Sequence, residues 1–232
     1  MFTFSFVKIE IGGKNMEKKE RIIVPSYTLG EELVNAISHG IFALLSVWGL
    51  VMLIIKAHGG LEITTVTLYG TTMILLYTIS CIYHSLSPRI TGKKVMRVLD
   101  HCNVFLLVFG TIIPIALVGI GGYLGWIYFG ISAFITVIGI TFSAINVDKN
   151  QKIEVACHLI NGWSALFLIK KLISNIGKYG VILIIAGGLI YSIGTILYAL
   201  GSKKKYIHSV FHFFCIAASI CHYFAIYLFV LR

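Results

Sequence analysis

The chain has 232 residues, of which 58% are hydrophobic and only 12% are charged, and its mean hydropathy is +0.92. A soluble domain is typically about 45–50% apolar and about 25% charged. The composition therefore excludes an ordinary soluble enzyme, a disordered tail and a nucleic-acid-binding protein. It predicts an integral membrane protein.

Seven apolar stretches are candidates for membrane-crossing helices. A bilayer core about 30 Å thick needs about 20 apolar helical residues, and long continuous runs favour helices over the alternating strands of a barrel. The candidates are residues 34–55, 63–84, 99–118, 123–146, 153–170, 179–200 and 206–231, of which the fifth is the shortest. The sequence predicts an all-α, seven-transmembrane-helix bundle over residues 31–232.

The first 30 residues are predicted to form a cytoplasmic segment. They contain no apolar core followed by small residues, so they do not read as a cleavable signal peptide. Met16 begins a hydrophilic stretch, MEKKERIIVP. We expect residues 1–15 to be either dispensable or the product of an upstream start codon.

The positive charges predict the orientation of the bundle. Fourteen of the 19 Lys and Arg residues precede the first helix or lie between helices 2 and 3, 4 and 5, and 6 and 7. All of these segments share one side of the membrane, and positive residues favour the cytoplasm. We therefore expect a multi-pass protein of the cell (plasma or inner) membrane with a cytoplasmic N-terminus and an outside C-terminus. The basic residues are interpreted as topology determinants and not as a ligand site.

Polar residues inside apolar helices are costly and usually face the bundle interior. Several lie at helix ends that the predicted topology brings to the cytoplasmic level: Glu32 and His39 in helix 1, Ser80 and His84 in helix 2, Asp100 in helix 3, and His208 and His212 in helix 7. Four separate helix ends thus bring polar or ionisable groups to one depth. The charge count did not use these residues, so the agreement is independent.

The spacing of two histidines suggests a metal site. His208 and His212 lie four positions apart and share one helix face, and one histidine from another helix would complete a set of three. Three protein ligands plus a water are typical of catalytic zinc. Asp100 is a candidate to orient or deprotonate that water, and Ser80 lies one turn before His84. The alternative is a structural hydrogen-bonded cluster between helices.

Several motifs occur in order along the chain: Glu31-Glu32-x-x-Asn35-x-x-Ser38-His39-Gly40, Ser80-x-x-x-His84, Leu99-Asp100-His101, Gly110-Thr-x-x-Pro114, Gly188-x-x-Tyr191-x-x-Gly194 and His208-x-x-x-His212. From Glu31 to Leu231 the chain resembles the hemolysin III proteins. These are the bacterial branch of the progestin and adipoQ receptor (PAQR) family of seven-helix membrane proteins.

The resemblance implies one zinc ion near the cytoplasmic face. Its ligands match His84, His208 and His212, the aspartate that meets the zinc-bound water matches Asp100, and the neighbouring serine matches Ser80. The wider superfamily resembles membrane-embedded hydrolases that include alkaline ceramidases. The chemistry implied is hydrolysis of a lipid amide or ester, with a membrane lipid as substrate and no nucleic-acid partner.

Two other functions compete with a ceramidase-like hydrolase. The family name implies a pore-forming cytolysin, although no export signal is recognisable. A membrane sensor with purely structural zinc is the third alternative. Glu32, Asn35 and His39 are accessory polar candidates, either as helix-entrance and interior contacts or as part of the site.

Further polar residues are expected to act mainly in packing. Glu154, His158 and Asn161 share a face of helix 5 and either line the same cavity or, as favoured here, make packing contacts. His222 is expected to form an interhelical hydrogen bond. Pro114 is expected to kink helix 3.

Overall fold

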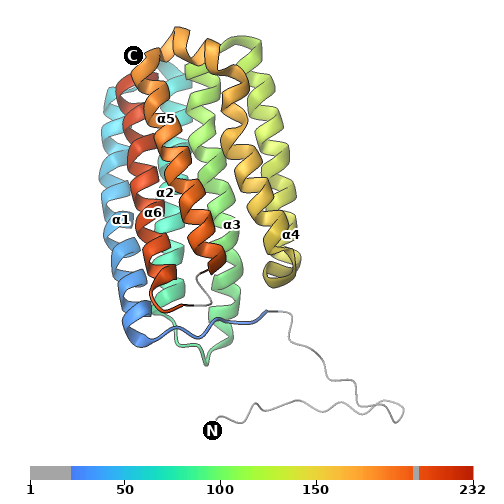
Figure 1. The fold of residues 1–232 in the computed structure, drawn as a ribbon. Coiled ribbons are helices and arrows are strands. Elements are labelled where there is room, and N and C mark those ends of the chain that lie inside the picture. Colours follow the sequence, from blue (N-terminus) through green and yellow to red (C-terminus); the bar gives the residue numbers. More distant parts are fainter. Residues whose placement is uncertain (1–21, 201–203, 232) are drawn as a thin grey trace.

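The structure, a computed structural model, describes residues 22–200 and 204–231. Over these ranges the chain is helical and contains no strand. The expectations for residues 1–15 and for Met16 lie outside the described residues. Figure 1 shows a bundle of long helices, with the start of α1 at one end and the C-terminal end of the chain at the other.

The α-helices are α1 (Leu29–Lys56), α2 (Gly59–Ser85), α3 (Thr91–Pro114), α4 (Gly122–Trp163), α5 (Ile169–Leu200) and α6 (Ile207–Ala225). The π-helical segments η1 (Ile115–Ile120) and η3 (Ile226–Val230) extend α3 and α6, and the 3-10 segment η2 (Ser164–Leu168) joins α4 to α5. Thus α3 changes its winding at Pro114, where the sequence predicts a kink. Sequence neighbours pack together, as α1 with α2, α2 with α3, and α5 with α6.

By length and composition, five helical stretches among the described residues could cross a membrane, and one of them runs from Gly122 to Ala199. Two breaks interrupt that stretch. Asn146 leaves helical geometry (φ −168°, ψ 99°), and its Oδ1 accepts the backbone N–H of Lys149 at 2.9 Å, as an N-cap residue does. Gly177 has φ 74° and ψ 168°, a conformation that glycine adopts without a Cβ clash. Figure 1 shows the chain reversing direction near both breaks.

The distribution of side chains is that of a protein in lipid. Large apolar side chains cover the outside, and Leu44 and Phe167 are 75% and 92% exposed. Polar side chains such as Asn35, Ser80 and Asn161 are buried instead. A soluble protein rarely exposes so continuous an apolar surface. The chain is therefore a multi-pass membrane protein whose polar groups face the bundle interior.

Close helix contacts depend on particular glycines, and Gly139 gives a testable case. A Cβ at Gly139 would lie 2.1 Å from Cε1 of the buried Phe105 ring, whereas a Cβ at the exposed Gly130 would meet no atom within 4 Å. We expect Gly139→Ala to destabilise the protein by about 1–3 kcal/mol through overpacking. Gly130→Ala should change stability little. Thermal melting of both variants in detergent checks this, and equal melting temperatures would contradict it.

Candidate metal centre

Three buried histidines from two helices meet at one end of the bundle. His84 lies in the last turn of α2, and His208 and His212 lie in the first two turns of α6. One side-chain nitrogen from each lies within 4.8 Å of the others. The Nε2 atoms of His208 and His212 are 3.2 Å apart. The three residues predicted as metal ligands therefore form one possible metal site.

The geometry of this cluster suits a tetrahedral ion. Two nitrogens bound at about 2.0–2.1 Å to such an ion lie roughly 3.3 Å apart, and the His208–His212 pair is at 3.2 Å. The Nε2 atom of His84 is buried and has no hydrogen-bond partner. An orphaned buried nitrogen is costly, and a metal ion would satisfy it. The donor set of imidazole nitrogens is one that zinc accepts.

Asp100 and Ser80 lie beside this cluster. Asp100 lies in the third turn of α3, and Ser80 lies in α2, one turn before His84. The Ser80 side chain faces the Asp100 carboxylate, and both line a cavity that also reaches His208 and His212. The structure thus places the two predicted catalytic residues at the same end of the bundle as the three histidines.

The helix 1 residues contact the cluster directly. The Glu32 carboxylate bonds Nδ1 of His84 at 2.6 Å, and the Asn35 amide nitrogen lies 3.4 Å from the same atom. The His39 ring stacks on the His212 ring, with centroids 3.8 Å apart and an interplanar angle of 20°. The adjacent Glu31 has another function, because it forms a capping box with Thr28 and accepts the backbone N–H of Tyr206.

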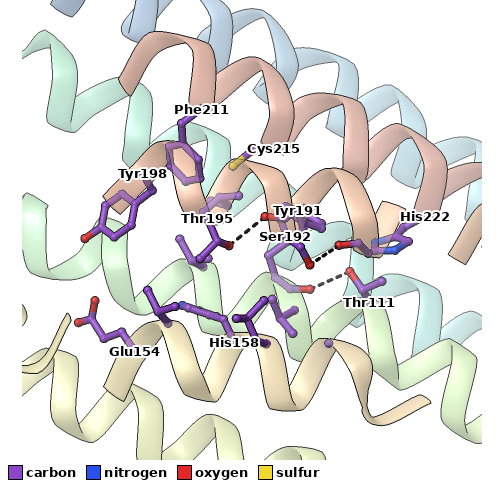
Figure 2. A pocket seen from close by; sticks show the side chains of 18 of the residues that line it. Thr111, Glu154, His158, Tyr191, Ser192, Thr195, Tyr198, Phe211, Cys215 and His222 are labelled. Atoms are coloured by element: carbon purple, nitrogen blue, oxygen red, sulfur yellow. Dashed lines mark hydrogen bonds between the residues drawn. The ribbon is translucent and has the colours of Figure 1, made fainter. Parts of the chain in front are cut away.

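A cavity of about 150 Å³ runs from the cluster along the bundle interior. Polar side chains line one end of the cavity: Ser80, Asp100, His101, Glu154, His208 and His212. Most of the remaining lining consists of apolar side chains, such as Leu76, Leu107 and Ile112. Figure 2 shows Glu154 and Tyr198 at one end of the pocket and Thr111 and His222 at the other. The hydroxyls of Thr111, Ser192 and Thr195 donate hydrogen bonds to backbone carbonyls of their own helices. The lining is therefore mainly apolar, and its two carboxylates, Asp100 and Glu154, lie at one end.

The polar residues of α4 separate into two groups. Glu154 and His158 line the cavity, where Glu154 bonds Nδ1 of His101 at 3.2 Å and the Ser143 hydroxyl at 2.5 Å. Asn161 instead bonds Thr136 Oγ1 at 3.1 Å. The favoured expectation of packing contacts alone therefore holds for Asn161, whereas Glu154 and His158 also face the cavity.

The His222 prediction is confirmed, because the ring lies 3.2 Å from the Ile184 carbonyl of α5. This contact joins α6 to α5 through a ring nitrogen and a backbone oxygen. Gly187 makes room for it, since a Cβ there would lie 2.4 Å from Nε2 of His222. His222 therefore serves helix packing, as its distance along α6 from His212 suggests.

Comparison with known proteins places this arrangement in a family. The family described as "Haemolysin-III related" matches residues 27–223, which include the three histidines, Asp100 and Ser80. The chain belongs to the haemolysin III family. It is 37% identical over 205 residues to Hemolysin-3 of Bacillus cereus, covering 87% of this chain and 92% of that protein. It is 33% identical over 203 residues to the Hemolysin-3 homolog of Bacillus subtilis (strain 168), covering 86% and 94%.

A human protein is a more distant relative. The monocyte to macrophage differentiation factor of Homo sapiens is 20% identical over 216 residues, covering 88% of this chain and 87% of that protein. This similarity fits the link between the haemolysin III family and the progestin and adipoQ receptors. The resemblance inferred from the motifs is therefore confirmed.

Two basic residues of this haemolysin III protein have a structural role beyond determining topology. Lys93 is fully buried and Arg97 is 7% exposed. Lys93 Nζ bonds the Glu32 carboxylate and the Leu86 carbonyl, and Arg97 forms two hydrogen bonds with Asp148. A buried cation needs such partners. Charge counting could not detect these pairs, because the partners are distant in sequence.

Residues 22–28 cross the end of the haemolysin III bundle below the cluster (Figure 1). The Arg97 guanidinium donates to the Ile23 carbonyl at 2.6 Å, and Asp148 accepts the Ile23 N–H at 3.0 Å. The Tyr27 ring stacks on the His208 ring, with centroids 4.9 Å apart and an interplanar angle of 18°. Burial raises the pKa of the Tyr27 phenol well above its usual range. The segment covers the histidine cluster from outside the bundle.

Because the Tyr27 ring covers His208, we expect a bound metal ion to exchange slowly with solvent. An aromatic pair contributes about 0.5–1.5 kcal/mol, so we expect Tyr27→Ala to speed loss of metal to a chelator between about two- and tenfold. Tyr123→Ala is the control, because Tyr123 is an exposed tyrosine at the start of α4 and does not line the cavity. Chelator-induced metal loss followed by absorbance measures both rates. An unchanged rate in Tyr27→Ala would show that the ring does not limit access.

Proposed function

We propose that this haemolysin III protein is a zinc-dependent hydrolase of membrane lipids with a ceramidase-like chemistry. The observation that supports this most strongly is the cavity. Its apolar lining suits a hydrocarbon segment, and its polar end contains Asp100, Ser80 and two of the three clustered histidines. A lipid amide or ester bond placed at that end would lie beside both the metal centre and a carboxylate.

The proposal includes seven membrane crossings with the metal centre near the cytoplasmic face. The breaks at Asn146 and Gly177 divide Gly122–Ala199 into three pieces, and each is long enough for a bilayer core that needs about 20 residues. Together with the other four stretches this makes seven. An odd number of crossings fits the start of α1 and the C-terminal end lying at opposite ends of the bundle (Figure 1).

The residues divide the chemistry of hydrolysis between them. His84, His208 and His212 would hold zinc, which when bound lowers the pKa of its water to about 7 and polarises a carbonyl. Asp100 takes a proton from the attacking water and passes it to the departing amine or alcohol. Ser80, next to Asp100, donates a hydrogen bond to the carbonyl oxygen, where negative charge develops. Water is thereby added across the bond, and a fatty acid and an amine or alcohol are released.

The test is a lipid screen with purified, zinc-loaded protein in mixed micelles. Ceramides and other N-acyl lipids come first, followed by ester lipids, with released fatty acid measured by mass spectrometry. We expect release by the wild-type protein and none by His84→Ala. Release that is equal in the two proteins, or absent for every lipid class with zinc bound, would contradict the proposal. Bound zinc without turnover would instead favour a sensor with structural metal.

A second candidate is membrane permeabilisation, which the name Hemolysin-3 of the Bacillus cereus relative favours. A dye-leakage assay with liposomes separates the two functions. Leakage that persists in His84→Ala would support permeabilisation, because that activity would not need the metal centre. Leakage that is absent with the wild-type protein would argue against it.

A further inference from the structure

A buried network connects α1 and α3 to the metal centre. One oxygen of Glu32 bonds Nζ of Lys93, and the other bonds Nδ1 of His84 at 2.6 Å. The side chains of Lys93 and His84 are fully buried, and that of Glu32 is 13% exposed. Lys93 also donates to the Leu86 carbonyl at 2.8 Å, in the turn that follows α2. Three segments of the chain therefore meet at one carboxylate.

The network determines which nitrogen of His84 is available. A carboxylate only accepts hydrogen bonds, so Nδ1 must carry the proton when it bonds Glu32. The remaining nitrogen, Nε2, then has a free lone pair, and it is buried without a hydrogen-bond partner. This is the tautomer that a metal ligand requires, because a protonated nitrogen cannot coordinate.

From this geometry we infer that Glu32, held by Lys93, is the positioning residue of the metal centre: it fixes the His84 imidazole with Nε2 directed at the site shared with His208 and His212. This inference rests on the metal binding of the proposed function. Carboxylates that bond the second nitrogen of a metal-ligating histidine fix its ring and tautomer, and their loss typically weakens metal affinity 10- to 100-fold.

An ion pair that only neutralises Lys93 would not need the second oxygen of Glu32 on His84. The adjacent acid shows the difference. Glu31 is also buried, but its oxygens bond the Thr28 hydroxyl and the backbone N–H groups of Thr28 and Tyr206. Glu31 therefore stabilises the start of α1 without contacting a histidine of the cluster. Two neighbouring carboxylates thus have separate functions, and Glu31→Gln is a matched control.

The first measurement is zinc affinity, by competition with a chromophoric chelator. We expect Glu32→Ala to bind zinc 10- to 100-fold more weakly than wild type, Glu32→Gln to lose less because its amide oxygen still accepts from Nδ1, and Glu31→Gln to keep wild-type affinity. Because Glu32→Ala leaves Lys93 buried without its carboxylate, the double variant Glu32→Leu/Lys93→Met, which also lacks an acceptor for Nδ1 of His84, serves if folding fails. It removes both charges and should still bind zinc more weakly than wild type. Wild-type affinity in Glu32→Ala or in the double variant would overturn the inference.

The second measurement needs no metal and no activity. Nitrogen NMR of histidine-labelled, metal-free protein, with the His84 signal assigned from His84→Ala, reports which ring nitrogen is protonated. We expect protonated Nδ1 in wild type and in Glu31→Gln, and a mixture of tautomers in Glu32→Ala. An unchanged tautomer in Glu32→Ala overturns the inference. If the wild-type protein binds no zinc, the proposed function fails, whereas this measurement still decides whether Glu32 positions His84.

Discussion

Replacing His208 and His212 together with alanine is expected to abolish metal binding. Their Nε2 atoms are 3.2 Å apart and belong to two of the three groups that could hold an ion. A single remaining imidazole is a weak site, since zinc in proteins has at least three protein ligands. We expect about one zinc per chain in the purified wild-type protein and none in the double variant, measured by elemental mass spectrometry.

The same experiment has a stability readout. A metal that binds only the folded protein stabilises it, by about 2.7 kcal/mol at a free concentration 100 times the dissociation constant. Zinc should therefore raise the melting temperature of wild type but not of His208→Ala/His212→Ala. His58→Ala is the control, because His58 is an exposed residue before α2 and remote from the cluster. A wild-type protein that takes up no zinc when it is supplied would remove the basis of the hydrolase proposal.

Much of the metal centre follows from the sequence, because it depends on helix geometry. The i, i+4 spacing of His208 and His212 guarantees that both imidazoles share a face of α6, whatever α6 packs against. The third histidine follows from the family resemblance, because the positive charges predict both His39 and His84 at the depth of this pair. Ser80 and Asp100 were found by the same reasoning.

Contacts between distant segments could not be predicted in that way. The bonds from Glu32 to His84 and Lys93 join residues that are 52 and 61 positions apart, and no local periodicity encodes them. Lys93 and Arg97 appear in the sequence as the charged flank of an apolar stretch, so the predicted helix begins near residue 99. The structure extends α3 back to Thr91, where both cations are buried and each bonds a carboxylate. The stacking of Tyr27 on His208 is likewise a consequence of tertiary packing.

Replacing Asp100 with asparagine is expected to stop turnover while zinc remains bound. Asp100 does not belong to the group of three residues that could hold the metal ion, and it lines the cavity beside Ser80. Asparagine keeps the size of the side chain but cannot take a proton from water, and loss of a general base typically costs about 10²- to 10⁴-fold in rate. Zinc content and fatty-acid release, measured on one preparation, give both quantities.

The pair of readouts for Asp100→Asn separates the three functions considered for this chain. Turnover that falls while zinc content stays at the wild-type level assigns the carboxylate to catalysis and not to metal retention. Full turnover would show that Asp100 is not the base. Glu62→Gln is the control, because Glu62 bonds the backbone N–H of His58 at the far end of α2 and lies outside the cavity. A sensor with structural zinc predicts no turnover in any of these proteins. A cytolysin predicts the same dye leakage from all of them. Only the hydrolase predicts a loss of turnover that is confined to Asp100→Asn.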